Sequence, residues 1–414
     1  MHDDRNEHID GPGIGERAVP GPTGRPQRWP RACRRTALTI GLAGLVGASA
    51  TAFGGLAPAS TAATRPAATG TISADGVSVF ARVPAPGHPF GIAVDSDRVY
   101  VTTSDGDFFA PHLNSNGERV FAYDLNGRLE RTTKIATLSR ATMGLNGIAL
   151  DGNQGKDHAA FVADMNGRIL RVGVGVGGRR SQPTVFAEAP EPFTYGNWGA
   201  TMWNDLVFDP AGRLYMTDDK PRIWRVATDG TPQVWFQDSR LMGLFGFAGG
   251  PLGGRIDPTG RYLYFAVTVS NVFPTDSLVY RLPLVDQPGP GDLELVHRFP
   301  AAPGDIPGQT TPNATGIAFA ASGNLYVALS GAQQVAVLDP AGNELRRISS
   351  PLFDSPWGLA FLGDSLLVSN ASIRPEESPD RWNVLTVNVS EPGLPLNRPT
   401  VPVPAAGHEH HDRS

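Results

Sequence analysis

Cysteine is nearly absent from this sequence of 414 residues, and its absence excludes several kinds of chemistry. The single cysteine, Cys33, lies ahead of a segment that we expect to be removed on export. The mature chain would then hold no thiol, which excludes cysteine nucleophiles, thiolate metal sites and a disulfide scaffold. Charged residues are also few, at 18 %, and the formal net charge is -5. Such a mildly acidic chain offers no electrostatic surface for nucleic acid or for an anionic membrane.

Several motifs of common enzymes and membrane proteins are missing as well. No G-x-S-x-G or H-E-x-x-H pattern occurs, so the sequence supports neither a serine hydrolase nor a zincin. The glycine-rich residues 243–254 lack the Lys-Ser/Thr ending of a phosphate-binding loop. The apolar run at residues 37–52 is too short and too rich in glycine and alanine for a membrane span of ~20 residues.

The N-terminal residues are predicted to be an export signal. Arg34 and Arg35 precede the apolar run, and small residues follow it at 58–63. A charged region, a short apolar region and a small-residue end are typical of a secretory signal. The arginine pair and the long polar region before it resemble a twin-arginine signal, and an ordinary secretion signal is the alternative. We therefore expect a secreted or extracytoplasmic protein without membrane attachment once the signal is removed.

Glycine (49) and proline (37) are abundant, and their spacing indicates many turns between short strands. One sequence pattern recurs six times: Gly or Asp begins an apolar strand, and a tight turn leads to a second strand. The copies are residues 91–104, 147–164, 205–218, 254–267, 316–330 and 358–370. Further strands follow these pairs. Four antiparallel strands in units of roughly 40–60 residues are typical of β-propeller blades.

The ends of the repeat predict how the ring of blades closes. The sixth copy is followed by a third strand at residues 382–389 but by no fourth strand. Residues 77–84 precede the first copy and resemble a fourth strand, so they can complete the last blade and remove an open edge. The predicted fold class is therefore all-β, a six-bladed β-propeller of four-stranded antiparallel blades. The predicted organisation is an export signal at 1–63, a linker at 64–76, the propeller at 77–390 and a disordered tail at 391–414 with His408, His410 and His411.

One rim of the predicted channel is the expected place for functional residues. The innermost strands line the channel, and the tight turns of the repeat lie on the opposite rim. Asn146 and Asn204 share one register, just before the repeated Gly or Asp, and are predicted to point into the channel. A buried amide needs partners, which a metal or a polar ligand would supply. The loop aspartates of this rim, which include Asp164, Asp218 and Asp219, are better explained as turn caps.

Other residues near this rim are candidates for substrate contacts. Phe90, Trp203 and Trp357 could line an apolar pocket, and packing between blades explains them about equally well. Asn313 lies just before the first strand of the fifth copy. His88 is the one histidine that this register places on the rim. Its pKa near neutrality would suit a general base, and a loop cap is the alternative.

The segment from Trp203 to Tyr215 carries the most specific similarity. Around Asn204 and Asp205 the chain resembles the gluconolactonase/regucalcin-like (senescence marker protein) family of six-bladed propellers, whose central calcium activates a lactone or ester. The resemblance implies that Asn204 ligates Ca²⁺, or another divalent cation, and that Asp205 supports it. The glutamate that the family has in its first blade is absent from residues 87–90, and one of the family's four ligands is matched.

The resemblance implies an exported hydrolase that opens a lactone or cleaves an ester, with the cation as Lewis acid on the carbonyl oxygen. The expected roles are catalysis for His88 and Asp205, metal binding for Asn146 and Asn204, and substrate binding for Phe90, Trp203, Asn313 and Trp357. Two alternatives remain open, a non-catalytic NHL-like binding propeller and a metal-free strictosidine-synthase-like propeller. The expected partner is a small-molecule lactone or ester, with no nucleic acid and no membrane, and the chain is expected to be a monomer.

Overall fold

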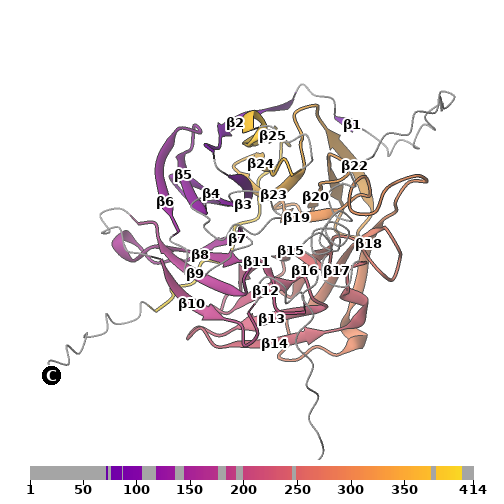
Figure 1. Ribbon diagram of the computed structural model, residues 1–414, viewed down its shortest axis with the longest axis horizontal. Helices are drawn as coiled ribbons and strands as arrows, with labels where there is room; N and C mark the ends of the chain where they lie inside the picture. The colour runs from indigo at the N-terminus through magenta and orange to yellow at the C-terminus, as the bar shows by residue number, and fades with distance from the viewer. Residues whose placement is uncertain are drawn as a thin grey trace, which may run out of the picture. The chain divides into compact units, whose positions relative to one another are not determined.

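The computed structural model describes residues 71–72, 76–85, 87–104, 118–135, 144–175, 183–192, 199–244, 249–373 and 379–402. All of them belong to one of the chain's two units, Ile40–Ser414. They form six antiparallel sheets arranged as a ring of blades (Figure 1). The predicted six-bladed β-propeller is thereby confirmed. The predicted export signal at 1–63 and His408, His410 and His411 lie outside the described residues.

Each blade is a four-stranded meander whose first strand is innermost. The first three blades are β3 (His88–Val94), β4 (Arg98–Ser104), β5 (Arg119–Asp124) and β6 (Leu129–Lys134); β7 (Leu145–Leu150), β8 (Ala159–Asp164), β9 (Arg168–Gly173) and β10 (Thr184–Glu188); and β11 (Trp203–Phe208), β12 (Leu214–Asp218), β13 (Arg222–Val226) and β14 (Pro232–Gln237). The fourth and fifth are β15 (Pro251–Ile256), β16 (Tyr262–Val267), β17 (Ser277–Pro283) and β18 (Glu294–Phe299); and β19 (Ala314–Phe319), β20 (Leu325–Leu329), β21 (Gln334–Leu338) and β22 (Glu344–Ser349).

The sixth blade closes the ring with a strand from the other end of the chain. It contains β23 (Pro356–Leu362), β24 (Ser365–Asn370) and β25 (Asn383–Asn388), and its outer strand is β2 (Val77–Arg82). Val77 lies opposite Val387 in an antiparallel pair, which confirms the predicted closure by the N-terminal strand. The short strand β1 (Thr71–Ile72) adds to the fifth blade, in parallel with β22.

The connections hold little helix, and the core lies between facing blades. The short 3₁₀ helices of the described residues are η2 (Gly155–Asp157), η3 (Ser239–Leu241), η4 (Pro290–Asp292) and η5 (Pro379–Arg381). None of the helices in this described part of the chain is long and apolar enough to cross a membrane. Between the second and third blades, the rings of Phe161 and Phe208 meet edge to face with centroids 5.2 Å apart. Burying each such ring contributes roughly 2–3 kcal/mol, so blade-to-blade packing holds the ring together.

Residues 391–402 differ from the expectation of a disordered tail. They cross the end of the channel at which the innermost strands finish, and we call them the C-terminal strap. The Leu394 N–H donates to the Phe319 carbonyl at 2.9 Å, and Asn153 Nδ2 donates to the Val401 carbonyl at 2.8 Å. The strap thus joins the fifth blade to the second. Its prolines suggested disorder, but its apolar side chains find an apolar surface at the strand ends, and Val401 is buried there.

Candidate functional site at the channel mouth

Every innermost strand carries a β-bulge at the same place, near its start. The pairing with the second strand skips two residues, for example between Leu145 and Ile148 and between Trp203 and Leu206. A bulge of this kind redirects a side chain without ending the strand. The first skipped residues of the six blades are Phe90, Asn146, Asn204, Leu252, Thr315 and Trp357, which we call the channel ring. Asn146 and Asn204 hold equivalent positions in it, as the repeat predicted.

The residue after a ring position is glycine in every blade except the third, because neighbouring innermost strands approach closely. A Cβ on Gly91 would lie 2.3 Å from the carbonyl oxygen of Asn146. A Cβ on Gly358 would lie 2.1 Å from the carbonyl oxygen of Phe90. No side chain fits at such distances. The repeated glycine is therefore the sequence feature that brings the ring residues together.

A chain of hydrogen bonds crosses the channel ring. The Trp357 indole N–H donates to Asn146 Oδ1 at 3.3 Å, and Asn146 Nδ2 donates to Asn204 Oδ1 at 3.3 Å. Asn204 Nδ2 in turn donates to the Pro251 carbonyl at 3.1 Å. Both amide oxygens thus accept from protein donors, which fixes the orientation of the two side chains. The predicted pair Asn146 and Asn204 is brought together, and Trp357 joins it from across the ring.

The remaining ring residues give the mouth an apolar side. Phe90, Leu252 and Trp357 form one cluster with Ala371, and Ile373 packs against it. The rings of Phe90 and Trp357 meet edge to face with centroids 5.0 Å apart. The mouth therefore combines aromatic and aliphatic surface on one side with amides on the other. Such a mixture suits a small organic molecule with a polar group.

An acidic residue next to the ring has an unusual environment. Asp219 follows β12 and is buried, and its carboxyl accepts hydrogen bonds from the Gly249 N–H and from Asn204. Burial raises the pKa of the Asp219 carboxyl to about 7, although the charge of Lys220 acts in the opposite direction. Burial also lowers the pKa of the Lys220 ammonium. A carboxyl that titrates near neutrality at a channel mouth is a candidate acid–base group.

Sequence reasoning placed Asp219 on this rim but interpreted it as a turn cap. The structure gives that role to its neighbour. Asp218 accepts from the N–H groups of Met202 and Lys220 at 3.0 and 3.1 Å and from the Trp224 indole at 2.8 Å. A turn needs one such carboxylate, and Asp218 supplies it. The presence of a second aspartate, Asp219, directly after it was therefore the feature of the sequence that could have indicated a functional group.

Asp205, which was predicted to support the metal ligand Asn204, lies deeper in the channel than the ring. Its Oδ2 accepts from Arg255 Nη1 at 2.7 Å and from the Gly254 N–H at 3.1 Å. This ion pair joins the innermost strands of the third and fourth blades. Sequence reasoning missed Arg255, because the partners lie far apart in the chain and come from different copies of the repeat.

Three predicted site residues do not reach the ring. His88 Nδ1 donates to the Ala371 carbonyl at 2.6 Å, and its ring packs edge-on against Trp382 at 5.0 Å. Trp203 is fully buried in the core between blades, where it meets Trp224. Asn313 stays within its own loop and accepts from the Thr311 hydroxyl at 2.8 Å. Their observed contacts are those of packing and of loop structure.

The sequence matches the SMP-30/gluconolactonase/LRE-like region over residues 116–371, more than half of the chain. The chain belongs to this family. No curated protein sequence matches it. Among solved structures, the calcium-binding protein regucalcin from Agrobacterium tumefaciens str. C58 is similar with a TM-score of 0.54 at 18 % identity, over 80 % of this chain and 99 % of that one.

Two further structures have the same architecture. A luciferin-regenerating enzyme matches with a TM-score of 0.54 at 14 % identity, over 78 % of this chain and 98 % of that one. A protein described as a putative gluconolactonase matches with a TM-score of 0.50 at 19 % identity, over 77 % and 93 % of the two chains. At such identities the likeness establishes the fold of this SMP-30/gluconolactonase-like chain and nothing more.

The ring of this family member does not fit the calcium ion that the resemblance implied. Ca²⁺ takes about six to eight oxygen ligands, including carboxylates. Phe90, Leu252 and Trp357 supply no ligand oxygen, and the amide oxygens of Asn146 and Asn204 already accept hydrogen bonds. Within the described ranges, no group of three or more His, Cys, Asp or Glu residues is arranged to hold a metal. Two engaged amides, the Thr315 hydroxyl, which donates to the Trp357 carbonyl, and the single carboxyl of Asp219 are fewer oxygen ligands than Ca²⁺ takes.

Proposed function

We propose that the channel mouth binds a small lactone or ester and that Asp219 is the general base for its hydrolysis. Membership of the SMP-30/gluconolactonase-like family supports this reaction class. The observation that carries the proposal is the Asp219 carboxyl, whose pKa burial raises to about 7 while it is hydrogen-bonded to Asn204 of the ring. A general base is most effective when its pKa lies near the working pH.

The proposed reaction needs one proton acceptor and one water molecule. The Asp219 carboxylate takes a proton from water as the water oxygen forms a bond to the carbonyl carbon. When the tetrahedral intermediate collapses, the bond from that carbon to the alcohol oxygen breaks, and the Asp219 carboxyl returns the proton to this oxygen. The second N–H of the Asn146 amide is a ring donor for the negative charge on the carbonyl oxygen.

The composition of the ring sets the kind of substrate that we expect. Phe90, Leu252 and Trp357 would contact an apolar face, and the amides would orient the polar one. A lactone or ester with a hydrocarbon or aromatic part fits this division better than a fully hydroxylated sugar lactone. This preference for a partly apolar substrate is inferred from the ring residues and not from the family relationship.

A pH profile of hydrolysis tests the proposal. With a panel of alkyl lactones and aryl esters, kcat/KM should rise about tenfold per pH unit below pH ~7 and then level off. Asp219→Asn should lose about 100-fold or more in kcat/KM. The matched control is Asp229→Asn, because Asp229 lies in an exposed turn on the opposite rim. Full activity in Asp219→Asn would refute the role of this carboxyl.

The proposed reaction does not use the Ca²⁺ expected from the resemblance. A cation bound only by the native state at a concentration of 100 Kd would add roughly 2.7 kcal/mol to the free energy of unfolding. We expect no saturable rise in Tm with millimolar CaCl₂ and no loss of activity in EDTA. A rise that Asn204→Ala removes would restore the predicted metal role of Asn146 and Asn204.

A non-catalytic binding propeller is the second candidate, and one observation favours it. The ring amides are joined to one another and to Trp357, so much of their hydrogen-bonding capacity is used within the protein. Under this alternative the wild-type protein would hydrolyse no member of the panel faster than buffer. Asp219 would then be a buried acid without a chemical role.

Export and oligomeric state are also proposals. The support for export is the arginine pair and apolar run within residues 1–63. Fractionation of cells that express the full chain should find the protein outside the cytoplasm. Replacing both Arg34 and Arg35 by lysine should abolish export if the signal is of the twin-arginine type, and should leave it unchanged if the signal is an ordinary one. Sedimentation analysis tests the expected monomer.

A further inference from the structure

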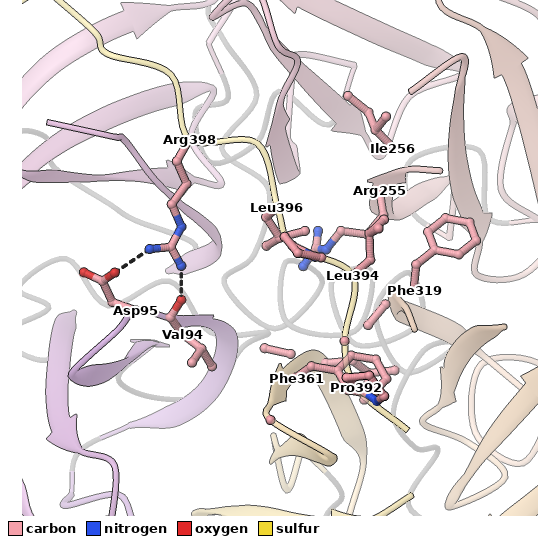
Figure 2. Close-up of a pocket in the computed structure, with 16 residues that line it drawn as sticks. Val94, Asp95, Arg255, Ile256, Phe319, Phe361, Pro392, Leu394, Leu396 and Arg398 are labelled. Atoms are coloured by element: carbon pink, nitrogen blue, oxygen red, sulfur yellow. Dashed lines mark hydrogen bonds and ion pairs between the residues drawn. The ribbon is translucent and has the colours of Figure 1, made fainter. Parts of the chain in front are cut away.

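A pocket lies between the C-terminal strap and the ends of the innermost strands, away from the channel ring (Figure 2). Its volume is about 270 Å³, slightly below the range of drug-sized binding sites. The apolar part of its wall comes from the strap and from the inner strands, and it includes Ile256, Phe319, Phe361, Leu394 and Leu396. The pocket is thus large enough for a small organic molecule.

Arg255 brings a nearly buried charge to this pocket. Its side chain is only 9 % exposed, and Figure 2 shows it extending toward the strap between Leu394 and Leu396. Its hydrogen bonds to Asp205 Oδ2 and to the Gly254 carbonyl, at 2.7 and 2.6 Å, both use Nη1. The Nε–Nη2 edge of the guanidinium has no partner among the described residues. That edge presents two parallel N–H groups, the arrangement that binds a carboxylate in bidentate fashion.

The other charges of the pocket are paired with one another. Arg398 of the strap donates to Asp95 and to the Val94 carbonyl, as the dashed lines in Figure 2 mark. Asp95 also contacts His158, whose Nε2 lies 2.9 Å from its Oδ2. Each of the two guanidinium groups of the wall thus has one carboxylate partner, Asp95 for Arg398 and Asp205 for Arg255. An anion would meet the free donor edge of Arg255 there.

We propose that this pocket is a second ligand site, separate from the channel mouth, for a small organic monocarboxylate with an apolar body. The carboxylate accepts two hydrogen bonds from the Nε–Nη2 edge of Arg255. Its hydrocarbon or aromatic part lies against Phe319 and Leu394. The corresponding amide is rejected, because its NH₂ group would face the guanidinium donors.

Fluorine NMR with 4-fluorophenylacetate as the probe tests the site on the full-length protein. Saturable line broadening is expected at sub-millimolar to millimolar concentrations, and 4-fluorophenylacetamide should bind at least tenfold more weakly. In the wild-type protein, Overhauser contacts from the probe should reach the methyl groups of Leu394 and Leu396. Equal binding of acid and amide, no saturation up to 10 mM probe, or contacts elsewhere would each overturn the proposal.

Variants separate this site from the channel mouth. Leu396→Trp should fill the pocket while both residues of the Arg255–Asp205 pair are kept, and it should abolish probe binding. Arg255→Lys keeps the charge beside Asp205 but lacks the two-donor edge, so binding should weaken at least tenfold. Asn204→Ala, at the mouth, should leave probe binding unchanged. Retained binding in Leu396→Trp, or lost binding in a folded Asn204→Ala, would place the probe elsewhere and refute the proposal.

Discussion

Replacing Asp219 by asparagine is expected to lower kcat/KM by about 100-fold or more and, at alkaline pH, to make the protein more stable. Burial raises the pKa of this carboxyl from 3.8 to about 7. The folded protein therefore binds a proton that the unfolded chain releases between pH ~4 and ~7. Across this window the free energy of unfolding falls as the pH rises, because ionisation is easier in the unfolded chain. Asparagine stays neutral and removes this loss.

The size of the effect follows from the same shift. Each pKa unit corresponds to about 1.4 kcal/mol, so ionised Asp219 costs on the order of 4 kcal/mol in the folded protein. Asparagine can keep one of the hydrogen bonds from Gly249 and Asn204 but would weaken the other, at a cost of about 1–2 kcal/mol. The expected net gain at pH 9 is about 2 kcal/mol, or a rise in Tm of roughly 4 °C.

Calorimetric melting of the wild type and of Asp219→Asn at pH 5 and pH 9 measures this difference. At pH 5 both side chains are neutral, so the variant should be equal to the wild type or slightly less stable. At pH 9 it should melt at the higher temperature. Asp229→Asn, in an exposed turn, should show the same small change at both pH values. A variant that is less stable at pH 9, or a difference that does not depend on pH, would refute the reasoning.

Three further outcomes are expected. Gly358→Ala should destabilise the protein by several kcal/mol in urea unfolding, because its Cβ would lie 2.1 Å from a carbonyl oxygen of the next blade, whereas Gly291→Ala, with nothing within 4 Å, should be nearly neutral. Hydrogen bonds to Asp151 and Asp95 raise the pKa of the His158 imidazole to about 9. This interaction contributes roughly 1–2 kcal/mol to the free energy of unfolding after solvent screening. The contribution is present below pH ~6.5 and is lost as the pH rises through ~9. The melting curves of His158→Gln and of the wild type should therefore converge above pH ~9. Removing residues 391–414 should lower Tm by several degrees, because the strap joins the fifth blade to the second through Leu394 and Val401.

The architecture was predictable because its local requirements recur along the chain. Every blade has tight turns, and every blade except the third has a glycine where neighbouring innermost strands meet, so these residues repeat at the blade period. The closing strand at residues 77–84 was recognisable because it resembles other outer strands, and it forms β2. The equivalent positions of Asn146 and Asn204 in the channel ring were predictable for the same reason, since both precede the repeated glycine or aspartate.

The rest of the candidate site depends on contacts between residues of different blades, and a single sequence does not reveal which residues make these contacts. His88 lies only two residues from Phe90, yet the bulge directs Phe90 to the ring and leaves His88 against Trp382. The raised pKa of Asp219 arises from its burial in the folded protein, which its neighbours in the sequence do not reveal. The proline-rich composition of the strap suggested disorder, because composition says nothing of contacts with other parts of the chain. In the structure Val401 packs on an apolar surface formed by residues of the second and third blades.

The way in which the ring closes also governs when the molecule can fold during synthesis. Val77 is made before any blade, but its partner Val387 follows only after the strands of all six inner meanders. Until Val387 is made, β2 has no strand to pair with and the first blade lacks its neighbour on one side. A nascent chain with five blades therefore has to keep two open sheet surfaces from pairing with other chains. Chaperones that hold such a chain until β25 has emerged should raise its yield more than those that act after the ring has closed.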